Sequence, residues 1–329
     1  MSVKNSNSLT SRVMSEIMAD CRVIASEQAP VVILGEHGSG KCWTAKMIHE
    51  RSNRKDRIFS RVNCYSMKED EIEKRLFGYL SINGDRYVQI KSGLIESCDG
   101  GTLYIEGFEV LSKKLQHKII NTVDSRSAKH VGSSPKVNTN VRLIVSSSET
   151  ASQNNENFVR NETSIFEINP YIIYMPPLRN HREDIASLIR LFLDKYSVCE
   201  NCNSAIKTEI SPEALYACIQ YHWPGNIRQL ENAIRLAVLL SAGQTLMPEH
   251  LPESVRNNRL SKNGITRAQE NESFQEAEKN LLRELLFHNS YSSEMIAARF
   301  YISPQKLEEK IRRYRLNHNS HRSMKKERN

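Results

Sequence analysis

The chain has 329 residues, of which 39% are hydrophobic and 26% are charged, and its formal net charge is +8. A chain of this length predicts two or three domains with a substantial buried core. It has no run of 18 apolar residues and no apolar signal core at the N-terminus, which excludes a membrane-spanning helix and a secretory signal. Its seven cysteines lack regular spacing and favour free thiols in a reducing compartment. We therefore expect a cytoplasmic protein without a membrane partner.

The first half of the chain alternates β-rich runs with segments of helical periodicity. Residues 1–29 predict a short amphipathic helix with Val13, Ile17 and Cys21 or Ile24 on one face. Alternation of this kind is typical of a parallel sheet with helices on both faces. We predict an α/β subdomain over residues 1–175, with strands at 31–34, 58–63, 103–105, 141–146 and 171–175.

The motif that carries most information is Gly-Glu-His-Gly-Ser-Gly-Lys-Cys at residues 35–42, which fits the G-x-x-x-x-G-K half of a phosphate-binding loop. It lies between an apolar run and a helix-like segment, as the motif requires. Glycines let backbone N–H groups surround phosphate oxygens, and Lys41 would reach the β- and γ-phosphates. Cys42 replaces the usual Ser or Thr that binds Mg²⁺. The predicted nucleotide-binding residues are Gly35, Glu36, His37, Gly38, Ser39, Gly40, Lys41 and Cys42. The alternative is a relic loop in a domain that serves as a scaffold.

The second half of the chain has a wholly helical pattern after Pro176 and Pro177. Helices are expected over residues 182–196, 211–221 and 227–241, and Ser211 followed by Pro212 is a good helix start. The polar segment 254–272 predicts a linker. We therefore predict a helical subdomain at 176–253, a linker at 254–272, a second helical domain at 273–317 and a basic tail at 318–329.

The C-terminal helical domain has the features of a DNA-binding unit. The last 27 residues contain nine Lys or Arg and three acids, a net charge of +6. Ser303 and Pro304 predict the start of a third helix, with Leu307 and Ile311 facing inward. The residues expected to contact double-stranded DNA are Ser303, Gln305, Lys306, Lys310, Arg312, Arg313 and Arg315, of which Gln305 and Lys306 are the candidates for base contact. The alternative is a helical interaction module with a basic face.

Seven stretches, in order, resemble the central AAA+ domain of bacterial sigma-54-dependent activators, the enhancer-binding proteins. They are 35–41, 62–64 (Val-Asn-Cys), 76–78 (Leu-Phe-Gly), 99–103 (Asp-Gly-Gly-Thr-Leu), 175–179 (Met-Pro-Pro-Leu-Arg), 182–185 (Arg-Glu-Asp-Ile) and 223–232 (Trp-Pro-Gly-Asn-Ile-Arg-Gln-Leu-Glu-Asn). The C-terminal unit resembles the Fis-type helix-turn-helix of these activators. The resemblance implies an AAA+ parallel-sheet domain with a helical lid, ATP or ADP with Mg²⁺ as cofactor, and Arg228 as the second-sensor arginine. It also implies oligomers and RNA polymerase as a candidate partner.

The chain departs from the family in the loop that touches sigma-54. The family sequence there is Gly-Ala-Phe-Thr-Gly-Ala, whereas the matching positions 82–87 read Ile-Asn-Gly-Asp-Arg-Tyr at unchanged spacing. The loop keeps its length and loses its contact sequence. We therefore do not expect this chain to remodel sigma-54.

A second departure lies at the Walker B position, where the family has Asp-Glu and this chain has Glu106 and Gly107. Glu106 can still hold Mg²⁺ through a longer side chain. Gly107 cannot accept a proton from the attacking water, and loss of a general base typically costs about 10²–10⁴ in rate. This position predicts impaired hydrolysis of a bound nucleotide.

Two further departures concern positions that act on the terminal phosphate in the family. The arginine-finger positions fall on Asn161 and Glu167, with Arg160 one residue away, and such a finger contributes on the order of 10³–10⁵ in turnover. The sensor triplet Ala-Thr-Asn becomes Ser-Ser-Ser at 146–148, where Ser148 can hydrogen-bond with shorter reach. Binding residues persist while several hydrolysis residues are changed.

Three functional hypotheses follow. The first, which we favour, is a DNA-binding transcriptional regulator with a nucleotide-binding, hydrolysis-impaired AAA+ domain that does not remodel sigma-54. The second is an active ATPase that activates sigma-54 polymerase through a divergent loop. The third is a regulatory subunit of a mixed hexamer with an intact AAA+ paralogue, in contrast to a homo-oligomer.

Overall fold

The computed structural model describes most of the chain, and for a few of these residues only the backbone. The described residues are 11–83, 87–129, 131, 136–148, 168–196 and 208–256, together with 279, 282, 283, 286, 293–299 and 302–316. They belong to two compact units, residues 1–181 and 182–329. Within these residues no helix has both the length and the apolar character needed to cross a membrane.

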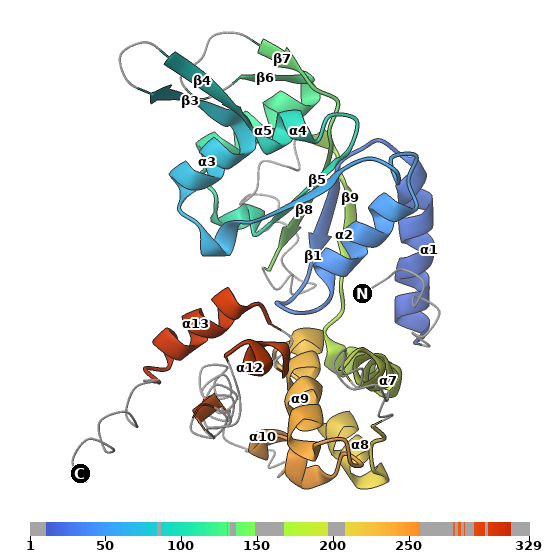
Figure 1. The fold of residues 1–329 in the computed structure, drawn as a ribbon. Coiled ribbons are helices and arrows are strands. Elements are labelled where there is room, and N and C mark those ends of the chain that lie inside the picture. Colours follow the sequence, from blue (N-terminus) through green and yellow to red (C-terminus); the bar gives the residue numbers. More distant parts are fainter. Residues whose placement is uncertain are drawn as a thin grey trace, which may run out of the picture. The chain divides into compact units, whose positions relative to one another are not determined.

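A five-stranded parallel sheet forms the centre of the first unit (Figure 1). Its strands are β1 (Val31–Leu34), β2 (Phe59–Asn63), β5 (Thr102–Glu106), β8 (Arg142–Ser147) and β9 (Tyr171–Tyr174). Their order is β2-β5-β8-β1-β9, and every neighbouring pair is parallel. The five predicted runs are therefore confirmed, each within one residue at either end. Because all strands run the same way, the segments after β1, β5 and β8 meet at one edge of the sheet.

Helices cover both faces of this sheet, and alternate strand residues belong to different cores. Val31 and Ile33 pack with Met47 and Ile48 of α2 (Lys41–Glu50) and with the apolar residues of α1 (Arg12–Ser26). On the other face, Val32 packs in a cluster with residues from three helices and four other strands. Those helices are α3 (Glu69–Phe77), α4 (Leu94–Ser97) and α5 (Lys113–Asp124).

The N-terminal helix is present, but its buried face differs from the predicted one. Met14, Met18 and Cys21 are buried, whereas Val13 is 41% exposed. Residues 14, 18 and 21 recur at spacings of four and three, so they lie on one helical face, and Val13 lies about 100° away from Met14. The prediction that Val13 shares the buried face was wrong, because two methionines rather than Val13 form the apolar stripe.

Two antiparallel hairpins extend the first unit and were not defined from the sequence. One pairs β3 (Gly78–Asn83) with β4 (Tyr87–Ser92), and the other pairs β6 (Ser127–Lys129) with β7 (Lys136–Asn138). In the first hairpin Asn83 pairs with Tyr87. The positions that replace the sigma-54 contact loop therefore form the end of a hairpin, and its middle residues, 84–86, lie outside the described part.

The second unit is helical, as predicted. It contains α7 (Ile185–Tyr196), α8 (Pro212–Gln220), α9 (Asn226–Ser241), α10 (Glu253–Arg256), α12 (Ser293–Arg299) and α13 (Pro304–Arg313). Ser211 accepts a hydrogen bond from the Ala214 amide at 3.2 Å, which confirms it as the cap of α8. Short 3₁₀ turns complete the two units at Cys64–Ser66, Phe108–Val110, Leu178–Asn180, Arg182–Asp184 and Pro248–His250.

A buried tryptophan organises the turn before α9. Trp223 is fully buried, and its Nε1 donates to the Cys218 carbonyl oxygen at 2.7 Å. The Asn226 amide then donates to the Trp223 carbonyl at 2.7 Å, and Gln229 Oε1 accepts from the Gly225 amide at 2.8 Å. The Trp-Pro-Gly-Asn motif thus closes the turn that starts the helix carrying Arg228.

The described C-terminal residues form a small apolar cluster. Leu307 of α13 and Ile296 of α12 are buried there with Leu282, and Ile311 and Tyr314 pack against them. Ser303 accepts a hydrogen bond from the Lys306 amide at 3.3 Å, which confirms it as the cap of α13. The inward positions predicted for Leu307 and Ile311 are confirmed.

Candidate nucleotide site

The Gly35–Lys41 segment forms a compact loop between β1 and α2. Gly38 and Gly40 have φ angles of 76° and 103°, in the left-handed region that favours glycine. Gly35 has a different reason to be glycine, because a Cβ there would lie 2.7 Å from the Met175 carbonyl oxygen. Ser39 Oγ is buried and has no hydrogen-bond partner among the described residues. The loop therefore has the backbone shape, and one available hydroxyl, for an anionic ligand.

Lys41 is folded back onto its own loop. Its Nζ donates to the carbonyl oxygens of Gly35 at 2.6 Å and Glu36 at 2.8 Å. Lys41 also begins α2, and the residue before it, Gly40, makes no side-chain cap. The first turn of α2 thus presents backbone amides and the positive end of the helix dipole at the loop.

A bidentate ion pair connects the phosphate loop to the segment after β9. Arg179 donates from Nη1 and Nη2 to the two carboxylate oxygens of Glu36, at 2.9 and 2.7 Å. The hydrogen bond to Glu36 raises the pKa of Arg179. This contact brings the Pro-Pro-Leu-Arg stretch beside the loop and explains how two distant motifs belong to one site.

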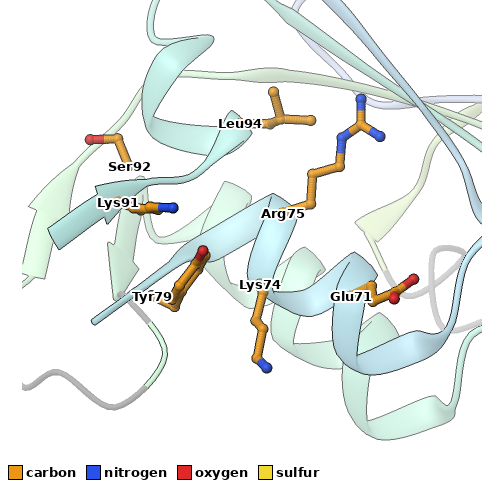
Figure 2. Close-up of a pocket in the computed structure, with 7 residues that line it drawn as sticks. All are labelled: Glu71, Lys74, Arg75, Tyr79, Lys91, Ser92 and Leu94. Carbon is orange, nitrogen blue, oxygen red and sulfur yellow. The ribbon is translucent and has the colours of Figure 1, made fainter. Parts of the chain in front are cut away.

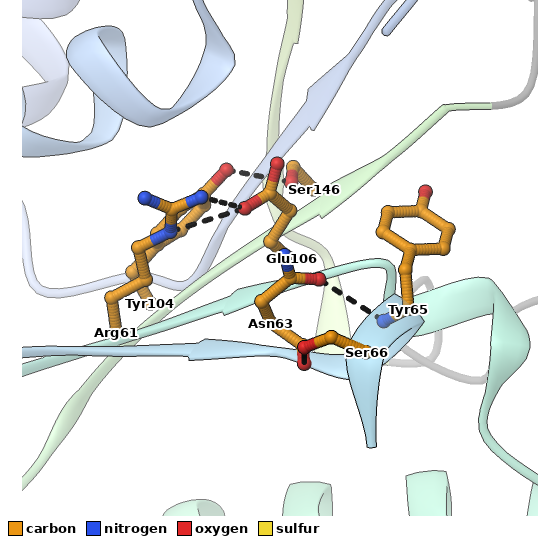
Figure 3. Close-up of polar contacts among 7 residues, drawn as sticks. All are labelled: Arg61, Asn63, Tyr65, Ser66, Tyr104, Glu106 and Ser146. Carbon is orange, nitrogen blue, oxygen red and sulfur yellow. Dashed lines mark hydrogen bonds and ion pairs between the residues drawn. The ribbon is translucent and has the colours of Figure 1, made fainter. Parts of the chain in front are cut away.

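Glu106 ends β5 and is paired with an arginine of the neighbouring strand (Figure 3). Arg61 donates to Glu106 Oε2 from both Nε, at 3.1 Å, and Nη2. Beside this pair, the hydroxyls of Tyr104 and Ser146 lie 2.8 Å apart. A Mg²⁺ ion held by Glu106 would have to share that carboxylate with Arg61.

Gly107 follows Glu106 in a conformation and a space that both suit glycine. Its φ is 81°, and a Cβ built there would lie 2.8–3.1 Å from three carbons of the Tyr65 ring. The Tyr65 ring also meets the His37 ring of the phosphate loop edge-on, with centroids 4.9 Å apart. An aromatic ring therefore lies between the phosphate loop and the position where the family has its catalytic glutamate.

The Tyr65 hydroxyl continues into a polar network. It donates toward Glu109 Oε1 at 2.5 Å and lies 2.7 Å from Ser148 Oγ. Ser148 donates to the same Glu109 oxygen from its amide at 3.0 Å and its hydroxyl at 2.8 Å. Burial and the hydrogen bond to Glu109 raise the pKa of Tyr65, so the phenol keeps its proton. We name this set, His37, Tyr65, Glu109 and Ser148, the tyrosine network.

Sequence reasoning found two members of this network and missed the other two. His37 and Ser148 were singled out, whereas Tyr65 and Glu109 were not. The available signal was Gly107 itself, because a glycine at the end of a buried strand indicates that another group occupies the space of its side chain. Nothing in the sequence shows which residue that is.

The nucleotide group that the fold implies fits these residues. The glycine conformations, the uncapped start of α2 and the buried Ser39 hydroxyl suit phosphate oxygens, and Lys41 can exchange its carbonyl contacts for phosphate. Cys42 fits a metal ligand less well, because burial raises the pKa of its thiol and keeps it neutral. Among the described residues, no group of three His, Cys, Asp or Glu could hold a metal without the nucleotide.

The remaining predicted residues lie in three places. Arg228 is exposed in the first turn of α9, in the second unit. Asn161, Glu167 and Arg160 lie outside the described residues, so the arginine-finger prediction stays a prediction. On and after α13, Lys310 is partly buried and the other predicted DNA-contacting residues are exposed: Ser303, Gln305, Lys306, Arg312, Arg313 and Arg315.

A separate hollow of about 460 Å³ lies where the β3–β4 hairpin meets α3 (Figure 2). Lys91 lies over the Tyr79 ring, with its Nζ 5.4 Å from the centroid. The hollow contains more cationic than acidic side chains, and its lining residues are Glu71, Lys74, Arg75, Tyr79, Lys91, Ser92 and Leu94. It shares no residue with the phosphate loop or the tyrosine network.

Comparison with known families matches two domains of this chain. Residues 8–168 match the sigma-54 interaction domain, and residues 179–268 match the AAA+ ATPase lid domain. The transcriptional regulatory protein FlbD of Caulobacter vibrioides is 30% identical over 314 residues, which cover 92% of this chain and 68% of FlbD. The regulatory protein AtoC of Escherichia coli is 32% identical over 246 residues, which cover 75% of this chain and 53% of AtoC. The chain thus spans about two thirds of one relative and about half of the other.

The fold is similar to that of solved structures of NtrX from Brucella abortus. The ATP complex of NtrX matches with a TM-score of 0.62 and 25% identity, covering 93% of this chain and 68% of NtrX. The ADP complex matches with a TM-score of 0.65 and 24% identity, covering 93% of this chain and 69% of NtrX. The architecture of the described residues is therefore one that is already known from solved structures.

Proposed function

Because this chain belongs to the sigma-54-dependent transcriptional activator family of AAA+ proteins, we propose that it is a DNA-binding regulator that holds a nucleotide and hydrolyses it poorly. The observation that carries the proposal is the Tyr65 ring packed against Gly107. It occupies the space from which a carboxylate would activate water. The proposal extends to ATP or ADP as ligand, with Mg²⁺ near Glu106.

Nucleotide binding is supported by the phosphate loop and the start of α2. The phosphate loop, Lys41 and the start of α2 retain every feature that holds phosphate, and NtrX, of similar fold, has been solved with both ATP and ADP. When bound, the nucleotide would supply a phosphoanhydride whose terminal group leaves on attack by water. This chain's residues would bind and orient it, and Gly107 has no side chain to take the proton of that water.

Poor hydrolysis is supported by the pairing of the nearby carboxylates. Glu106 is paired with Arg61, and Glu109 accepts hydrogen bonds from Tyr65 and Ser148. An attacking water would have to compete with these donors for the same carboxylate oxygens. We therefore do not expect either acid to replace a glutamate at position 107.

DNA binding is supported by the C-terminal helices. α13 begins at a serine cap, buries Leu307 and exposes Lys306, Arg312 and Arg313, together with the acids Glu308 and Glu309. In a helix-turn-helix such a helix enters the major groove, where its first residues read base edges and its later cations bind phosphate. We propose base contacts by Gln305 and Lys306 and phosphate contacts by Lys310, Arg312, Arg313 and Arg315.

The test measures nucleotide binding and turnover together on the full chain. Wild type is expected to bind ATP or ADP, with turnover at least 100-fold below that of an intact family member, as expected for loss of a general base. Lys41→Ala should lose binding. Lys46→Ala, on the same helix and paired with Glu50 at 3.5 Å, is the matched control and should bind normally.

Each alternative predicts a different result. Brisk turnover that disappears in Lys41→Ala, together with promoter opening by sigma-54 polymerase, would establish an active ATPase. Turnover that appears only after an AAA+ paralogue is added would establish a mixed oligomer. Absence of binding to both nucleotides would reject the proposal and leave the domain as a scaffold.

A further inference from the structure

We propose that the tyrosine network makes this site selective for a nucleoside diphosphate over a triphosphate. The inference rests on the proposed nucleotide binding and goes beyond it by naming the ligand that the site prefers. It concerns His37, Tyr65, Glu109 and Ser148, all of which belong to the first unit. The selectivity has a steric part, a charge part and a hydrogen-bonding part.

The steric part comes from the Tyr65 ring. It contacts His37 in the phosphate loop on one side and the backbone of Gly107 on the other. In phosphate-loop proteins the lysine reaches the β- and γ-phosphates, and the acid at the end of the adjacent strand holds Mg²⁺ between them. The segment after that acid therefore borders the terminal phosphate, and here an aromatic ring covers it.

The charge part comes from Glu109. Its Oε1 accepts from the Tyr65 hydroxyl and from both donors of Ser148, while its Oε2 is buried and accepts no hydrogen bond among the described residues. This carboxylate lies in the 3₁₀ turn that follows Gly107, next to Ser148, on the segment that borders the terminal phosphate. A triphosphate adds negative charge there, and repulsion between like charges is strong where water is excluded.

The hydrogen-bonding part comes from Ser148. In the family the sensor side chain donates to the terminal phosphate, but here the Ser148 hydroxyl donates to Glu109 at 2.8 Å. A third phosphate can recruit this donor only if the contact with Glu109 breaks. A diphosphate needs only the loop, Lys41 and the start of α2. Of these parts, only His37 in the loop belongs to the tyrosine network.

The test titrates the full chain with ADP and with ATP, each with Mg²⁺, by calorimetry. Wild type is expected to bind ADP at least tenfold more tightly than ATP. Glu109→Gln keeps the shape and removes the charge, so ATP affinity should rise at least fivefold while ADP affinity stays within twofold. Tyr65→Phe keeps the ring and removes the hydroxyl. It should reduce the preference for ADP over ATP by a smaller factor than Glu109→Gln does.

Glu73→Gln is the matched control, because Glu73 pairs with Lys118 on α5, away from the phosphate loop. It should leave the ADP-to-ATP ratio unchanged. Equal affinities of wild type for the two nucleotides would overturn the inference and leave the proposed nucleotide binding intact. A Glu109→Gln variant that changes both affinities equally would also overturn it, since that result indicates a general structural role. Failure of wild type to bind either nucleotide would reject nucleotide binding itself.

Discussion

Two separate demands keep glycine at position 107. The φ of 81° is unfavourable for a residue with a Cβ, and the Tyr65 ring occupies the space that a Cβ would need. Tyr65 in turn is held by Glu109 and Ser148 through its hydroxyl. A glutamate restored at position 107 would have to displace this ring, so one substitution is not expected to restore hydrolysis.

We predict that the cost of Gly107→Ala depends on Tyr65. In wild type the substitution should destabilise the fold by about 2–5 kcal/mol, the sum of left-handed strain and overpacking. In the Tyr65→Ala background only the strain remains, about 1–2 kcal/mol. Denaturant unfolding of the four proteins in this double-mutant cycle measures the coupling. An equal cost in the two backgrounds would show that the ring imposes no restraint on position 107.

At the scale of elements, each strand of the sheet contributes one part of the site at the same edge. The loop follows β1, Tyr65 follows β2, Glu106 ends β5 with Gly107 after it, the serine triplet lies at the end of β8, and Arg179 follows β9. The start of β8 has a different task. Arg142, 2% exposed, donates to the last carbonyl oxygens of α1, at 3.0 Å to Ala25 and 2.6 Å to Ile24. Burial lowers its pKa to about 10, so it remains charged at neutral pH.

We predict that Arg142→Leu destabilises the protein by about 2–4 kcal/mol, because it removes the guanidinium donors from the carbonyl oxygens of Ala25 and Ile24, of which Ile24 keeps the Glu27 amide. Arg12→Ala removes an arginine from the other end of the same helix. Its side chain is 91% exposed and pairs with Glu16, so the loss should be within about 0.5 kcal/mol. Chemical denaturation of both variants checks the contrast. A similar loss for the two arginines would mean that the buried contact is not important for attaching α1.

At the scale of the whole molecule, positive charge is concentrated far along the chain from the phosphate loop. The last 27 residues hold +6 of a total charge of +8, and α13 contributes the exposed cations Lys306, Arg312 and Arg313 beside the exposed acids Glu308 and Glu309. A clustered charge of this kind gives salt-dependent affinity for DNA, because each neutralised phosphate releases counterions. Binding by the later residues of α13 should therefore be sensitive to salt and insensitive to sequence.

We predict that Arg312→Ala and Arg313→Ala each weaken binding to a short random-sequence duplex and reduce the salt slope by about 1. Gln305→Ala should leave that slope unchanged and alter discrimination among sequences. Lys114→Ala, an exposed lysine of α5, is the control and should change neither quantity. Fluorescence anisotropy between about 50 and 200 mM salt measures the slopes. Unchanged salt slopes in both arginine variants would show that DNA contacts a surface other than α13.

Local patterns alone were sufficient to predict many elements. Five apolar runs predicted five strands, and Ser211 and Ser303 predicted two helix starts, because strand burial and helix capping depend on neighbouring residues in the chain. The phosphate loop was predicted for the same reason, since its glycines, lysine and flanking elements are contiguous. The buried face of α1 was predicted incorrectly at Val13, because several apolar stripes were available and only the packed sheet selects one.

The sequence by itself therefore determined the sheet, the phosphate loop and the absence of a carboxylate at position 107. Only the tertiary structure decided which group occupies the space of the missing side chain at position 107. Tyr65 follows β2, Glu109 follows β5 and Ser148 follows β8, so 83 residues separate the first from the last. Parallel strands bring their carboxyl ends together whatever their distance in sequence, and the contact between Tyr65 and Gly107 exists only after they pair.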